Sequence, residues 1–303
     1  MSMHWLNWLS WSNPVALWWG FLLAVSALNM ALLFGLRLSY RRNAFGGESR
    51  AFALEPLALL SAAYVFGCTF RSILPRADVQ RICLFDTWLS SVLVGRSVAT
   101  VAELCFALQW AVVLHELGRI THSDTAKNIA KAVVPLIALA ECCSWYAVIT
   151  TDFLGNVLEN SLWTATFALI AIALARLLLS FRGAVQSVIG TTAAGIAGYV
   201  YFMSTVDVPM YFSRWQLELA DGRPLFGLFS GLHDLASRWV VTHDFAQWHQ
   251  EIPWMSLYFS VAVWTSLLLG GFGLIRHLLP RYRVGRPLVK PTRRPLPVEV
   301  RSS

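Results

Sequence analysis

The chain is poor in charged residues. Asp, Glu, Lys and Arg make up only 14% of its 303 residues, whereas they make up about 25% of an average soluble protein. Hydrophobic residues account for 56%, and they include 14 tryptophans and 18 phenylalanines. This composition excludes an ordinary soluble domain and indicates an integral membrane protein, in which long apolar helices cross the bilayer.

Lysine and several sequence motifs are also scarce or missing. The three lysines are Lys127, Lys131 and Lys290, and none lies in the last apolar segment, which excludes a retinal protein with its Schiff base there. No two of the five cysteines have C-x-x-C spacing, so a zinc ribbon or a thioredoxin-like site has no support. The first residues lack the basic start of a secretory signal peptide, so we expect the first apolar segment to be a membrane span.

Seven segments of the chain are mainly apolar over about 20 residues, the length that crosses a bilayer. They are residues 15–37, 54–74, 91–115, 131–150, 159–181, 186–210 and 253–277. We therefore predict an all-α fold, in which residues 1–280 form a bundle of seven transmembrane helices. Residues 281–303 are basic and rich in proline, and we expect them to form a tail that attracts anionic lipids.

The positive charges predict the orientation of this bundle. The net charge is +7, and Lys and Arg gather in the first, third and fifth connections and in the tail. The N-terminal segment and the fourth connection have none. By the positive-inside rule the N-terminus lies outside and the C-terminus lies in the cytoplasm, as in a bacterial inner membrane or an equivalent one. Because no nucleic-acid-binding motif accompanies the charge, we expect no nucleic-acid partner.

Two outer segments and the N-terminus carry further structural predictions. Residues 76–92 have mixed polarity and predict a short helix at the membrane interface. Residues 212–252 form the longest outer loop, which is typical of a lid or a binding element. Trp5, Trp8 and Trp11 recur every three residues, which predicts that their indoles anchor one helical face at the level of the lipid headgroups.

The third predicted span contains charged residues that are costly in a bilayer. Residues 94–110 read VGRSVATVAELCFALQW, and Arg96, Thr100 and Glu103 follow one another at helical spacing on one face. An ionised side chain near the bilayer centre costs about 2.5–3.5 kcal/mol on insertion scales, so such residues face the bundle interior and often mark a functional site. We therefore predict that this face lines a site.

Most other polar residues of the predicted spans fall in the outer half of the bundle, which predicts an acid-rich, aromatic pocket there. A carboxylic acid buried in apolar surroundings keeps its proton near neutral pH and can act as a general acid. The candidate catalytic residues are Glu103 and Glu141 as acids and Asp207 as the base. The candidate substrate-binding residues are Arg71, Arg96, Tyr146, Glu159, Asn160, Trp163, Tyr211 and Arg214.

This pocket favours an enzyme that performs acid–base chemistry on a lipid or an isoprenoid-like substrate, with aromatic faces stabilising a developing cation. A different class of function stays open: a non-enzymatic protein that binds or senses a ligand, or an assembly subunit of a membrane complex. A proton or solute transporter fits less well, because the inner half of the bundle has few polar residues to continue a pathway. The buried charges could also neutralise one another as a packing network.

No metal site or cofactor follows from the residues. Carboxylates together with His243 and His249 offer oxygen and nitrogen ligands, but their spacing does not place both imidazoles on one helical face. The motifs H-x-x-x-H and H-E-x-x-H are missing as well. We therefore predict no metal site, leave the cofactor open, and expect membrane lipids, a hydrophobic small molecule or another membrane protein as partners.

Overall fold

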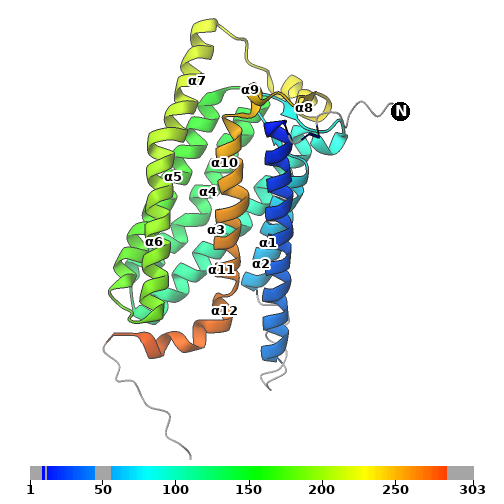
Figure 1. Cartoon of the computed structure of the whole chain (residues 1–303). Coiled ribbons are helices and arrows are strands. Elements are labelled where there is room, and N and C mark those ends of the chain that lie inside the picture. Colours follow the sequence, from blue (N-terminus) through cyan, green and yellow to red (C-terminus); the bar gives the residue numbers. More distant parts are fainter. Residues whose placement is uncertain (1–8, 11, 45–55, 285–303) are drawn as a thin grey trace, which may run out of the picture.

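The computed structural model describes residues 9–10, 12–44 and 56–284, and these residues are mainly helical. The first five long helices are α1 (Pro14–Ala44), α2 (Pro56–Ile73), α3 (Val92–Thr121), α4 (Asp124–Thr150) and α5 (Phe153–Leu178). They run up and down in turn, and each packs against the next one in sequence (Figure 1). The predicted helical fold is confirmed.

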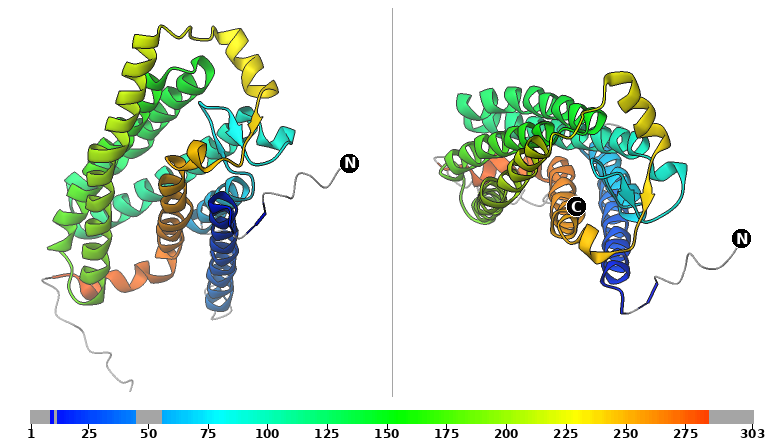
Figure 2. Two further views of the ribbon diagram at one scale, coloured as in Figure 1. Left: turned by 45° about the horizontal axis from the view of Figure 1, so that its top comes forward. Right: turned by 90° about the horizontal axis from the view of Figure 1, so that it is seen from above.

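Two further helical stretches complete the bundle, and each contains a π-helical turn. The first consists of α6 (Ala184–Phe202), the π turn η3 (Met203–Asp207) and α7 (Val208–Asp221). The second consists of α10 (Glu251–Leu257), the π turn η4 (Tyr258–Ala262), α11 (Val263–Gly270), α12 (Phe272–Ile275) and the 3-10 helix η5 (Arg276–Tyr282). The first stretch packs along α5, and α11 packs against α2. Seen from above, α1 and the α6–α7 stretch lie on opposite sides of the molecule, with α10 between them (Figure 2).

Six helices of the described ranges are long and apolar enough to cross a membrane. They are Pro14–Arg42, Pro56–Ile73, Val92–Thr121, Asp124–Thr150, Phe153–Leu178 and Glu251–Ile275. The seventh predicted span, residues 186–210, is helical as well, since it covers most of α6 and η3. It is not among the six because its glycines, threonines and other polar residues lower its mean hydropathy.

Side-chain caps define where three of the helices begin. Ser91, Ser123 and Asp152 each accept a hydrogen bond from a backbone N–H in the first turn of α3, α4 and α5. Such a cap satisfies a donor that the helix itself leaves unpaired. Because the capping residue Ser123 precedes the apolar run, α4 begins at Asp124. Hydropathy places the start of this span later, at residue 131.

A group of short elements closes one end of the bundle, at the top of Figure 1, and we call it the cap and this end the cap end. The cap contains β1 (Arg76–Ala77), β2 (Ile82–Cys83), the 3-10 turn η2 (Trp88–Ser90), α8 (Leu228–Ser237), β3 (Val240–Val241) and α9 (Phe245–Trp248). β1 and β2 pair antiparallel, and β2 pairs in parallel with β3. The segment after α2 is thereby joined to the segment before α10.

The cap corrects one sequence-based prediction and refines another. Residues 76–92 do not form an interfacial helix, because the buried Arg76 and Arg81 hold this segment as a hairpin against the bundle. The Arg81 guanidinium donates to Asp234 Oδ2 of α8 and to the backbone oxygen of Val148 of α4, at 2.8 and 2.7 Å. The predicted loop 212–252 is largely helical, since it holds the end of α7 together with α8 and α9.

Aromatic side chains fill the middle of the bundle. Tyr64 stacks on Phe106 with ring centroids 4.7 Å apart, and Phe106 and Trp110 each lie 6.2 Å from Phe167. We call these four residues the aromatic layer. Its two members on α3, Phe106 and Trp110, follow Glu103 by about one and two helical turns. The layer separates the polar cap end from the opposite end. The predicted tryptophan anchor (Trp5, Trp8 and Trp11) and most of the predicted tail lie outside the described residues.

Candidate active site

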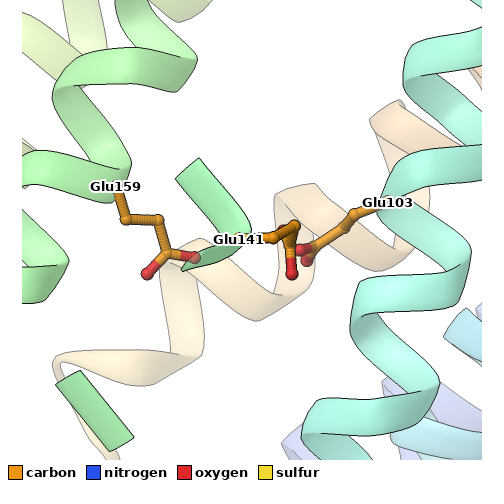
Figure 3. Close-up of side chains that lie close together, drawn as sticks. All are labelled: Glu103, Glu141 and Glu159. Carbon is orange, nitrogen blue, oxygen red and sulfur yellow. The ribbon is translucent and has the colours of Figure 1, made fainter. Parts of the chain in front are cut away.

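The polar residues of the bundle interior are organised around one guanidinium group. Arg96 on α3 donates through one nitrogen to Glu103 Oε2 at 2.6 Å and to Glu141 Oε2 at 2.8 Å. Its other terminal nitrogen lies 3.5 Å from Glu159 Oε1 and 4.0 Å from Asp78 Oδ2. Figure 3 shows the three glutamates converging from α3, α4 and α5. We call Arg96, Glu103, Glu141 and Glu159 the acid cluster.

Neighbouring side chains hold these carboxylates in place. The Thr100 hydroxyl donates to Glu141 Oε2 at 2.6 Å and accepts a hydrogen bond from Trp145 Nε1 at 3.1 Å. From η4 the Tyr258 hydroxyl donates to Glu103 Oε1 at 2.8 Å. The predicted stripe of Arg96, Thr100 and Glu103 therefore lies on one face of α3 and points into the bundle.

The acid cluster is not fully satisfied by the described residues. Three carboxylates share the single Arg96 guanidinium, and all four side chains are buried. Glu141 Oε1 and Arg96 Nε have no hydrogen-bond partner within these ranges. A buried polar atom without a partner is costly and marks a place where a proton, a water or a ligand is expected.

A polar cavity of about 80 Å³ adjoins the cluster, and we call it the acid cavity. Its charged lining residues are Arg71, Arg76, Asp78, Arg96, Glu103, Glu159, Asp207 and Glu251. Asn160, Tyr211, Trp254 and Tyr258 also line it. Since about 15 Å³ suffices for one water molecule, this volume holds several waters or a small polar group.

Most of the predicted site residues are brought together here. Arg71, Arg96, Glu103, Glu159, Asn160, Asp207 and Tyr211 line the acid cavity, and Glu141 bonds to Arg96 beside it. Trp163 packs on Phe167 one helical turn from Glu159. Arg214 pairs with the cavity residue Glu251, with 3.4 Å between the guanidinium and the carboxylate.

One predicted residue lies elsewhere. Tyr146 is 43% exposed on the surface of α4, and its hydroxyl donates to Asp152 Oδ2 at 3.0 Å, so it does not reach the acid cavity. The residue lies two positions beyond Ser144, which points inward. A change of two positions rotates a side chain by about 200° around a helix, so depth alone could not place Tyr146.

Sequence reasoning did not identify Arg76, Asp78 and Glu251 as site residues. Arg76 donates to Asp78 Oδ1 at 2.8 Å and to two backbone oxygens at the start of α3. Glu251 accepts hydrogen bonds from Gln80 and Arg214. Arg76 and Asp78 belong to the cap and Glu251 begins α10, so only pairing of distant segments brings them to the cavity.

The two cap residues affect each other electrostatically. Burial by itself would raise the pKa of the Asp78 carboxyl, but the surrounding arginines, Arg76 foremost, lower that pKa below its ordinary value. Burial lowers the pKa of the Arg76 guanidinium to about 10, although Asp78 opposes this change. The pair therefore carries opposite charges at neutral pH and closes the cavity on its cap side.

Both π turns face the acid cavity. Asp207 ends η3, and Tyr258 begins η4. Asp207 is 95% buried, yet its side chain makes no hydrogen bond or ion pair with the residues that the structure describes. π turns are rare and occur frequently at functional sites. Their position on two facing helical stretches supports a functional role for this cavity.

The three glutamates could also serve as metal ligands by distance alone, since one oxygen of each lies within 4.8 Å of the others. However, the Arg96 guanidinium pairs with all three carboxylates and supplies the positive charge that a metal ion would supply. The two candidate histidines lie apart from the cluster: His243 Nε2 is 2.9 Å from the backbone oxygen of Leu84, and His249 Nδ1 is 2.8 Å from that of Ala246.

The arrangement can hold and exchange protons between closely spaced carboxyl groups in a site shielded from bulk water. No protein-family model matches the chain, and neither the curated proteins nor the solved structures contain a match to it.

Proposed function

We propose that the protein spans a membrane seven times, with the N-terminus and the cap outside and the C-terminus in the cytoplasm. The seventh span is α6 with η3. A bridge between Phe181 and Arg283 holds the start of α6 at the end opposite the cap, while Asp207 lies at the acid cavity. α6 and η3 thus run along most of the length of α5, and the basic connections favour a bacterial inner membrane or an equivalent one.

Impermeant thiol labelling tests this orientation. Asp221 is exposed at the cap end and His122 is exposed at the opposite end. An impermeant maleimide should label Asp221→Cys in intact cells and should label His122→Cys only after lysis. The reverse pattern would contradict the orientation.

We further propose that the acid cavity is the active site of an acid–base enzyme whose substrate is a lipid or an isoprenoid-like molecule of the outer leaflet. The observation that carries this proposal is the acid cluster, in which three buried carboxylates share one guanidinium. Two negative charges would remain uncompensated if all three were ionised. In a low-dielectric interior such charges are neutralised by a proton or a bound cation.

Glu103 and Glu141 suit the two roles of this chemistry. Both accept from the same Arg96 nitrogen, so their oxygens lie close together. Two carboxylates this close share a proton, which leaves one as a general acid and the other as a general base. Arg96 and Tyr258 orient the pair, and Asp207 supplies a further carboxylate on the opposite wall.

Lipid turnover by the protein in nanodiscs made from total host lipid tests the enzyme proposal. Wild type should deplete a lipid or isoprenoid species and form a product that mass spectrometry resolves. Glu103→Gln and Glu141→Gln should slow this conversion by about 10²–10⁴-fold, the usual contribution of a general acid or base. Glu116→Gln, at the opposite end of α3, serves as the matched control and should convert at the wild-type rate. Equal turnover by all four proteins, or none by wild type, would contradict the proposal.

A second candidate function is an assembly subunit that binds another membrane protein. It is supported by large apolar side chains that lie exposed on α7 and α8, with Phe229 86%, Leu217 66% and Leu219 62% exposed. Such patches often mark interaction sites. Native mass spectrometry of the complex extracted from its own membrane distinguishes the two: a stoichiometric second polypeptide lost on Phe229→Ser supports assembly.

A transporter is less favoured, because the aromatic layer lies directly below the acid cavity.

A further inference from the structure

A second hollow lies on the surface of the cap end, next to the acid cavity, and we call it the vestibule. It has a volume of about 460 Å³. Its lining residues are Val79, Gln80, Phe153, Arg214, Glu218, Arg223, Arg238, Gln247 and Gln250. They come from the cap hairpin, α5, α7 and the segments around α8 and α9, which are distant in sequence. The vestibule therefore exists only in the folded protein.

The lining of the vestibule is rich in hydrogen-bond donors. Three guanidinium groups and three carboxamide groups face a single carboxylate, Glu218, so the charged lining residues have a net charge of +2. The acid cavity has the opposite character, with five carboxylates and three arginines in its lining, a net charge of −2. Arginine clusters with few carboxylates bind phosphate and carboxylate groups through charge-assisted hydrogen bonds.

The arginines of the vestibule are positioned by the surrounding residues. The Arg214 guanidinium lies 5.6 Å from the ring centroid of Phe153 and 5.3 Å from that of Tyr211. Arg238 pairs with Asp234 at 2.5 Å, and Arg223 pairs with Glu218. Each guanidinium has five N–H donors, so these contacts leave donors on each arginine for a ligand.

Two of the arginines remain accessible from the solvent side. The side chains of Arg223 and Arg238 are 42% and 49% exposed, whereas that of Arg214 is 17% exposed. An anion that enters the vestibule therefore meets Arg223 and Arg238 first and reaches Arg214 at the base.

The vestibule adjoins the acid cavity. Val79 and Gln80 line both hollows. Gln80 donates to Glu251 Oε1 at 3.0 Å, and Arg214 pairs with the same oxygen at 3.4 Å. A group held in the vestibule thus lies directly beside the carboxylates of the proposed active site.

We propose that the vestibule binds an anion of the phosphate type, either free phosphate or the phosphate of a lipid headgroup, through Arg214, Arg223 and Arg238. This proposal goes beyond the acid–base function and stands on different residues. It assigns an anionic group to the ligand and places that group on the cap side of the acid cavity.

The test compares wild type with the double variant Arg223→Gln/Arg238→Gln. The variant should fold, because Asp234 keeps its ion pair with Arg81 at 2.8 Å. The matched control is Arg119→Gln: Arg119 is also exposed and also pairs with a nearby glutamate, Glu116, but at the opposite end of the bundle. The thermal midpoint and the circular dichroism spectrum verify folding of each protein in phosphatidylcholine nanodiscs.

Two measurements distinguish the sources of the phosphate. In the first, inorganic phosphate is titrated at constant ionic strength, and a rise in the thermal midpoint reports binding. In the second, native mass spectrometry counts phosphatidic acid retained from nanodiscs of phosphatidylcholine and phosphatidic acid. The double variant should bind inorganic phosphate or phosphatidic acid at least about tenfold more weakly than wild type, as expected for the loss of charge-assisted hydrogen bonds. Arg119→Gln should bind both as wild type does.

A response to inorganic phosphate identifies a soluble anion, and retention of phosphatidic acid alone identifies a lipid headgroup. Binding that is equal in wild type and the double variant, or absent from both measurements, would overturn the proposal. Glu141→Gln should leave phosphate binding unchanged. If wild type binds phosphate but shows no turnover, only the enzyme proposal fails, and if it shows turnover but binds no phosphate, only the vestibule proposal fails.

Discussion

The two halves of the bundle both bury polar side chains, but they do so in different ways. At the edge of the aromatic layer away from the cap, beside Trp110, Gln109 donates to Ser61 Oγ at 2.7 Å and accepts from Ser266 Oγ at 2.7 Å. Ser61 in turn donates to the backbone oxygen of Ser266 at 2.6 Å. This network is neutral, and each of its side chains is paired. It joins α2, α3 and α11 and needs no ligand.

Above the aromatic layer, the acid cluster is charged and incompletely paired. Glu141 Oε1 and Arg96 Nε lack partners within the described residues, and carboxylates outnumber the guanidinium groups that contact them. A closed, neutral network stabilises helix packing, whereas an open, charged one costs stability and persists where function requires it. The Gln109 network is therefore closed, whereas the unpaired atoms of the acid cluster support the proposal that the chemistry takes place there.

The largest effect is expected from removal of the central cation. Arg96→Leu leaves three buried carboxylates without their partner, and breaking a buried ion pair on one side costs about 3–5 kcal/mol. The thermal midpoint of the purified protein should fall sharply. Glu103→Gln combined with Glu141→Gln in the Arg96→Leu background should restore much of it. No restoration would mean that Arg96 acts mainly through packing.

A smaller loss of stability is expected from the neutral network. Gln109→Leu removes the donor to Ser61 Oγ and the acceptor of the Ser266 hydroxyl, and an unsatisfied buried polar group costs about 1–3 kcal/mol. Chemical denaturation in detergent should register this loss, while lipid turnover per folded molecule stays at the wild-type value. A large change in turnover would contradict the proposal that the Gln109 network serves stability and not catalysis.

The pH dependence of stability tests the cap side of the cavity. The pKa of Asp78 is lowered in the folded protein, so its ionised form stabilises the fold. This contribution is complete above the ordinary pKa of about 3.9 and is lost as the pH falls through the lower folded value, at most about 1.4 kcal/mol per pH unit. The thermal midpoint of wild type should therefore fall more steeply below pH 4 than that of Asp78→Asn. Parallel curves would contradict this role of Asp78.

The smallest effect on stability is expected inside the acid cluster itself. Glu103→Gln keeps the shape of the side chain and removes one of the excess negative charges, so the free energy of unfolding should change by about 1 kcal/mol or less. The same substitution should slow turnover by about 10²–10⁴-fold. If Glu103→Gln is as stable as wild type but inactive, the acid cluster serves catalysis and not stability. If it is unstable but active, the acid cluster serves stability instead.

Helix content and the polar face of α3 could be predicted because both depend on local sequence. Arg96, Thr100 and Glu103 share a face through helical periodicity alone, and their cost in a membrane already indicated an inward orientation. Glu141, Glu159 and Asp207 could be assigned to the same half from their depth in the predicted spans. The partners that hold these residues in place could not be predicted, because they depend on which face each neighbouring helix presents.

The sequence by itself determined that long apolar helices form and that one end of the bundle is rich in acids, since hydropathy and helical periodicity act over short distances along the chain. Tertiary structure alone decided that residues 76–92 form a hairpin and that Asp78 and Glu251 line the acid cavity. It also decided that Tyr146 turns away and that three arginines surround the vestibule. The physical reason is that strand pairing and helix rotation depend on contacts between segments that are far apart in the chain, such as Cys83 with Val241.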